Sequence, residues 1–110
     1  MFEVGTSKPT SGYQINTDSY VYRSPFGQIV IYIDINATVV QSTWHIVAYV
    51  PQGYRPSNFI TMDAYIADAD GSLMPIYCFV YHDGNVKVLT NKPTGSYRLL
   101  INGSYFILHG

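Results

Sequence analysis

Charged side chains are scarce in this sequence, and the two signs nearly cancel. They make up 12% of the 110 residues, with 6 Lys and Arg against 7 Asp and Glu and a net charge of -1. Binding to the phosphates of nucleic acid or of an anionic membrane depends on an excess of basic side chains. The sequence also lacks a run long enough to cross a bilayer and the pattern of a secretion signal. We therefore expect no nucleic acid partner and no membrane insertion.

Cysteine and catalytic motifs are nearly absent as well. Cys78 is the only cysteine, which excludes an internal disulfide framework, and its apolar surroundings predict a buried thiol. His45, His82 and His109 lie too far apart in sequence to form a metal-binding motif. A glycine-rich phosphate loop, a GxSxG elbow and an HExxH helix are all missing. The sequence therefore predicts no enzyme, no metal and no cofactor.

Aromatic residues, by contrast, are abundant. They make up 15% of the chain, and 11 of them are tyrosines. A tyrosine combines a rigid apolar ring with a hydroxyl group, so it suits both hydroxyl-rich ligands such as sugars and protein interfaces.

Alternating hydrophobicity predicts an all-β protein. Odd positions of Ile29–Val39 are apolar and expected to face the core, while the even positions, Asp34 among them, are expected to face water. The sequence contains no helical period of useful length. The other expected strands are Tyr20–Arg23, Trp44–Val50, Phe59–Ile66, Ile76–Tyr81, Val86–Thr90, Tyr97–Ile101 and Ser104–Leu108. About eight short strands with turns between them predict a compact antiparallel β-barrel or sandwich.

The first 19 residues differ in composition from the rest. Residues 5–19 are rich in Gly, Ser, Thr, Pro and Asn, which is typical of a loop. We expect an arm over residues 1–19, with a short strand at Phe2 and Val4, followed by one domain over residues 20–110.

Two dipeptides predict tight hairpins. Asp83-Gly84 suits a two-residue type I′ turn that places Tyr81 opposite Val86, so that aromatic rings of the first strand fill the core.

The second dipeptide, Asn102-Gly103, predicts a terminal hairpin that is apolar on both faces. One of these faces has no core to pack against, and an apolar patch of that kind marks an interface between protomers. The expected contact residues are Leu100, Tyr105 and Ile107.

The central turn, Val50–Asn58, is the expected location of a binding site. Pro51 and Pro56 make it rigid, and the strands on either side present outward residues next to it. The candidate saccharide-binding residues are Trp44, His45, Tyr49, Tyr54, Arg55 and Asp63. Trp44 or Tyr54 would stack on a sugar ring, Asp63 would accept hydrogen bonds from hydroxyls, and His45 and Arg55 would donate them. Alternation places Trp44 in the core, although the start of a strand also allows it to lie exposed.

Three motifs suggest a family: "P-x-G-Y-R-P" from Pro51, "DGNVKV" from Asp83, and "GSYRLLINGSYFIL" from Gly95. Over residues 28–108 the chain resembles the C-terminal head domains of tail-tip and baseplate proteins of phages that infect Gram-positive bacteria, including receptor-binding proteins of lactococcal phages. In that family the Tyr54-Arg55 and Asp83-Gly84 positions look like parts of the scaffold.

The resemblance implies a β-barrel that trimerises on the virion, binds host cell-wall polysaccharide without a cofactor and contacts other baseplate or tail proteins. Two alternatives remain open. One is a structural baseplate protein that contacts only protein. The other is a polysaccharide hydrolase, because two aspartates on a β surface can form a glycosidase pair.

Overall fold

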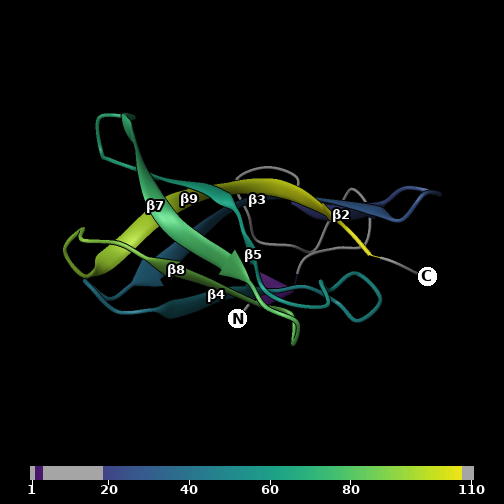
Figure 1. Ribbon diagram of the computed structural model, residues 1–110. Coiled ribbons are helices and arrows are strands. Elements are labelled where there is room, and N and C mark those ends of the chain that lie inside the picture. The colour runs from purple at the N-terminus through teal and green to yellow at the C-terminus, as the bar shows by residue number, and fades with distance from the viewer. Residues whose placement is uncertain (1, 4–18, 108–110) are drawn as a thin grey trace.

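The computed structural model describes residues 2–3 and 19–107, and strands are the only regular secondary structure in this part of the chain (Figure 1). The strands are β1 (Phe2–Glu3), β2 (Tyr20–Arg23), β3 (Gln28–Val39), β4 (His45–Tyr49), β5 (Ile60–Thr61), β6 (Asp63–Ala67), β7 (Leu73–Val80), β8 (Asn85–Leu89) and β9 (Gly95–Phe106). The predicted all-β class is confirmed. The strand expected at Phe2 is present, whereas Val4, the predicted loop over residues 5–18 and Leu108 lie outside the described residues. Within the described part, no helix has the length and apolarity needed to cross a membrane.

The strands form one strongly curled sheet in the order β1-β4-β8-β7-β6-β9-β3-β2, with β5 also paired to β7. All pairs are antiparallel except β1 with β4. The first half of β7, Leu73–Ile76, pairs with β6, and its second half, Tyr77–Val80, pairs with β8. Figure 1 accordingly shows β7 running between β3 and β9 on one side and β4 and β8 on the other. The sheet is a half-barrel that encloses one core.

The longest pairing joins β3 to β9 over 12 residues each, from Gln28 opposite Phe106 to Val39 opposite Gly95. The predicted terminal hairpin is therefore wrong, because Asn102 and Gly103 lie inside a continuous strand. The glycine serves close packing instead of a turn, since a Cβ atom at Gly103 would overlap the sulfur of Met62.

The core follows the predicted period of two along most strands. The fully or nearly fully buried side chains of β3, β6, β7, β8 and β9 alternate with exposed or half-buried ones: Ile29, Ile31, Ile33, Ile35, Val39, Ala64, Ile66, Cys78, Val80, Val86, Val88, Leu99, Ile101 and Tyr105. The burial of Cys78 confirms its prediction and raises the pKa of the thiol to about 12. The thiol is therefore protonated at neutral pH.

Asp34 departs from the pattern, because it lies on the outward side of β3 and is nevertheless fully buried. Its carboxylate accepts hydrogen bonds from Nε and Nη2 of Arg98 at 2.9 and 2.7 Å. Its backbone N–H donates to the hydroxyl of Ser19 at 2.8 Å. The expectation that this whole face is wet is thus wrong at Asp34, where a bidentate ion pair takes the place of water. The same pair raises the pKa of Arg98.

The β7–β8 hairpin is shifted by one residue from the predicted register. Val80, not Tyr81, lies opposite Val86. Of the two residues that a type I′ turn needs in the left-handed region, only Gly84 has a positive φ, at 91°. The turn is therefore the longer kind that ends in a glycine bulge. The shift moves the aromatic residues of β7 from the core to the outer face of the sheet.

A register shift in β4, between Ile46 and Ala48, reverses the predicted orientation of its first half. Trp44 and Ile46 are exposed, while Val47 is buried and His45 lies opposite a buried residue of β8. The assignment of Ile46 to the core and of His45 and Val47 to the outer face is therefore wrong, and of the two places left open for Trp44 the structure has the exposed one. A single extra residue in one strand exchanges the two faces of everything before it.

The central turn and the Asp83-Gly84 turn are joined by a hydrogen bond and by close packing. Val50 donates its N–H to the carbonyl of Gly84 at 2.8 Å, and Nε of Arg55 donates to the carbonyl of Val50 at 2.9 Å. A Cβ atom on Gly84 would lie 2.5 Å from that carbonyl oxygen and 2.6 Å from Arg55 Nε. The two motifs are thus one packing unit.

This contact predicts that Gly84→Ala destabilises the protein more than Gly71→Ala. Both glycines have a left-handed backbone, at φ 91° and 88°, so each variant loses about 1–2 kcal/mol through strain. Only Gly84 has neighbours that an added methyl group would strike, because the space beside Gly71 is open. Urea unfolding at unchanged m-value measures the difference. Equal losses in the two variants would contradict the packing role of Gly84.

Candidate functional site

The structure separates the predicted saccharide site into distinct places. Tyr49 lies on the outer face of β4 and Trp44 immediately precedes this strand, whereas Asp63 lies at the start of β6 among different neighbours. Tyr54 and Arg55 belong to the central turn, and His45 is half-buried on the inner side of β4.

The guanidinium of Arg55 makes its contacts within the protein. Its Nη2 donates to the hydroxyl of Tyr49 at 2.5 Å, and its guanidinium carbon lies 4.7 Å from the centre of the Tyr49 ring. With Nε bound to the carbonyl of Val50, the guanidinium holds the turn in place. The structure therefore gives Arg55 and Tyr49 a stabilising role.

Tyr54 is also part of the scaffold, because it packs against the core and its carbonyl accepts a hydrogen bond from the hydroxyl of Tyr105. Tyr105 is only 6% exposed, and burial raises its pKa. Its placement at a protomer interface rested on the terminal hairpin, and the continuous strand turns it into the core instead. Ile107 likewise packs against the core, whereas Leu100 is half-buried on the outer face of β9.

Asp63 belongs to a polar row that crosses four neighbouring strands. Tyr20 of β2 lies opposite Tyr32 of β3, which lies opposite Asn102 of β9, which lies opposite Asp63 of β6. Directly paired residues point to the same face of a sheet, so the four side chains stand side by side. Neighbouring strands are roughly 4.8 Å apart, so the row is about 14 Å long.

This row lines a groove of about 570 Å³, named the polar groove below. Its other lining residues are Gln28, Val30, Ile31, Thr61, Gly103 and Ser104. The groove opens where the segment Thr61–Asp63 moves away from β9. Asp63 still pairs with Asn102 of β9, but Thr61 pairs with Phe79 of β7. The rings of Tyr20 and Tyr32 meet at 6.0 Å at one end.

A second feature is a cluster of rings on the outer face of β4, β7 and β8 and the start of β5. This aromatic face consists of Trp44, Phe59, Phe79 and Tyr81. Phe79 lies at its centre, with its ring 5.3 Å from that of Trp44, 5.4 Å from that of Phe59 and 6.1 Å from that of Tyr81. Trp44 is 41% and Phe59 53% exposed. The ammonium group of Lys87 lies 4.9 Å from the centre of the Tyr81 ring.

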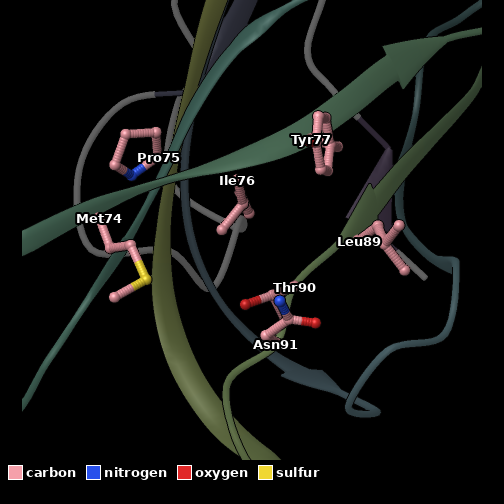
Figure 2. Close-up of a pocket in the computed structure, with 7 residues that line it drawn as sticks. All are labelled: Met74, Pro75, Ile76, Tyr77, Leu89, Thr90 and Asn91. Atoms are coloured by element: carbon pink, nitrogen blue, oxygen red, sulfur yellow. The ribbon is translucent and has the colours of Figure 1, made fainter.

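A smaller groove, of about 310 Å³, opens where β7 turns from β8 toward β6 (Figure 2). Its lining is Met74, Pro75, Ile76, Tyr77, Leu89, Thr90 and Asn91. These side chains carry no charge and only three polar groups, so this groove offers little that would orient a hydroxyl-rich ligand.

Within residues 2–3 and 19–107, no three His, Cys, Asp or Glu side chains come together in a way that would hold a metal ion. Sequence reasoning found Asp63 but missed Tyr20, Tyr32 and Asn102. The outward alternation of Tyr32 was visible in the sequence, but Asn102 was assigned to a turn and Tyr20 was given no orientation. The side-by-side placement of the row depends on the order of strands in the sheet.

No family model matches the chain, and comparison with curated proteins gives no match. The resemblance to phage head domains therefore stays a prediction.

The buried Tyr105 predicts a specific alkaline loss of stability. A folded-state pKa above the unfolded value of about 10 means that Tyr105 stabilises the fold below that pH, and that this contribution disappears as the pH rises further. Tyr105→Phe should lose about 0.5–1.5 kcal/mol at neutral pH, through the hydrogen bond to Tyr54. As the pH rises from about 8 to about 11, the free energy of unfolding of the variant should then fall less than that of the parent. Urea unfolding across this range, with the exposed Tyr65→Phe as control, measures both effects; identical pH profiles of parent and Tyr105→Phe would refute the assignment.

Proposed function

We propose that this protein is the head domain of a phage receptor-binding protein, which attaches the virion to its host by binding a cell-surface saccharide without cleaving it. The polar groove is the observation that carries the proposal. Two tyrosine rings, an amide and a carboxylate stand in one row along it. The motifs of the central turn and of the β7–β8 hairpin support the phage context by resemblance.

The chemistry of the groove suits a sugar. The apolar faces of Tyr20 and Tyr32 can stack on the C–H face of a pyranose ring. The carboxylate of Asp63 accepts hydrogen bonds from hydroxyls, and the amide of Asn102 both donates and accepts them. A concave surface with a few convergent polar groups is typical of small-ligand sites.

Binding is favoured over hydrolysis by the number of carboxylates. Glycosidases use a pair of carboxyl groups on either side of the scissile bond, about 5–9.5 Å apart. Among the described residues that line the polar groove, only Asp63 carries a carboxylate. Within this part of the chain the groove therefore offers groups that can retain a saccharide and no second carboxylate for its cleavage.

A structural baseplate protein that contacts only protein is the second candidate, and the aromatic face favours it. Exposed Trp and Phe side chains with one nearby charge resemble the centre of a protein interface. Binding of wall polysaccharide distinguishes the two candidates.

Trimeric assembly in the baseplate, next to other tail proteins, belongs to the same proposal. With Tyr105 and Ile107 committed to the core, the apolar outward side chains of β9, Leu100 and Phe106, are left for contact between protomers. Leu100 is half-buried there, and Phe106 is 66% exposed.

The groove predicts that Asp63→Asn and Tyr32→Ala weaken binding to Gram-positive wall polysaccharide about fivefold or more, which corresponds to ~1 kcal/mol or more for each contact. Both positions face outward, so the urea midpoint should change little. Tyr65→Ala, two residues after Asp63 on the same face of β6, is the control. Calorimetry measures the affinity, and an assay for new reducing ends checks for cleavage. Parent-like affinity of both groove variants, or release of sugar, contradicts the proposal.

Trimer formation predicts a solution mass of three times the 12.4 kDa chain. Phe106→Ser should shift the species toward the monomer, because burial of one phenylalanine contributes about 1.5–3 kcal/mol at each contact. Light scattering over a range of protein concentrations measures both masses. A monomer mass of the parent protein at every concentration would contradict the trimeric assembly.

A further inference from the structure

The segment Phe59–Asp63 connects the two surfaces described above. Its exposed positions, Phe59, Thr61 and Asp63, alternate with the half-buried Ile60 and the buried Met62. Residues two apart on a strand point to the same face, so these three side chains line one outer surface over about 13 Å. Phe59 belongs to the aromatic face and Asp63 to the polar groove.

Thr61 lies where the aromatic face and the polar groove meet. It lines the polar groove, and it is also the direct cross-strand partner of Phe79, the central ring of the aromatic face. The groove and the aromatic face are therefore continuous across Thr61.

We propose that this continuous surface binds an extended, neutral polysaccharide along its length, with several sugar units of one chain in contact at the same time. The inference rests on the proposed saccharide-binding function and specifies its ligand as a polymer. The row across the groove and the strand from Asp63 to Phe59 together give a path of about 27 Å, which exceeds the length of a single sugar. Units in the groove are held by hydrogen bonds and by stacking on Tyr20 and Tyr32, and units on the aromatic face by stacking alone.

The charges along the path select against an ionic polymer. Asp63 supplies one negative charge where the row meets the strand, near the middle of the path. Lys87 is the direct partner of Phe79 on β8, and its positive charge lies over the Tyr81 ring. The path therefore carries one charge of each sign and no excess of either. A polymer with a charge on each repeat would meet repulsion at one of these two groups, whereas a neutral chain meets none.

Chain length is the variable that tests the inference. Wall polysaccharide from Gram-positive bacteria, partly hydrolysed and fractionated by size, provides short and long fragments of one chemistry. The parent protein should bind long fragments about tenfold or more tightly than short ones, because stacking on the aromatic face is added to the groove contacts.

The variants separate the two areas. Phe59→Ser and Trp44→Ala should leave the affinity for short fragments unchanged and remove most of the gain with length. Asp63→Asn should weaken the binding of short and long fragments alike. Leu73→Ser, an exposed apolar residue of β7 outside the path, is the matched control and should behave like the parent.

Each other outcome has a definite meaning. If the affinity of Phe59→Ser and Trp44→Ala still increases with fragment length as in the parent, the groove acts alone. The inference then fails while the proposed function stands. Unchanged length dependence together with a smaller oligomer in Phe59→Ser would assign the aromatic face to contact between copies of the chain. Failure of the parent to bind any fraction or the intact polysaccharide removes the proposed function and the inference with it.

Discussion

The pairing of β3 with β9 is the constraint on which the rest of the structure depends. Its unbroken register over 12 residues fixes which side chains of both strands face inward. It also provides the two edges on which β2 and β6 assemble, so it sets the alignment of Tyr20 with Asp63 across four strands. Both the core and the polar groove are thus consequences of one ladder, and a shift of one residue in it would exchange them.

Much of the fold was predictable because alternation carries strong information wherever one face of a strand is buried. The odd positions of β3, the inward positions Met62 to Ile66 and the buried thiol of Cys78 all followed from pattern alone. The hairpin predicted at Asn102-Gly103 was wrong because this dipeptide, which is typical of a tight turn, can also supply a glycine that makes room for Met62 within a strand. The bulge in β4 left no signal that separates Ile46 from core residues, whereas the position of Trp44 at the start of its strand allowed exposure.

The candidate site shows a different limit. The kinds of side chain that suit a sugar were recognisable, but grouping them required strand order, which is a long-range property. Arg55 and Tyr54 looked accessible because they occupy a turn, yet the guanidinium of Arg55 bonds to Val50 and Tyr49, and Tyr54 packs against the core. Tyr20 and Asn102 carried no local mark of their own, since only the sheet brings them beside Asp63.

The strict separation of inward and outward positions has a consequence for how this protein can change. Tyr32, Asn102 and Asp63 project from the same strands that hold the core, but on the opposite face, so replacing them leaves core packing intact. Mutations at the row can therefore accumulate without a prior gain in stability. Under the proposed function, substitutions at this row would change the ligand preference while the fold is retained.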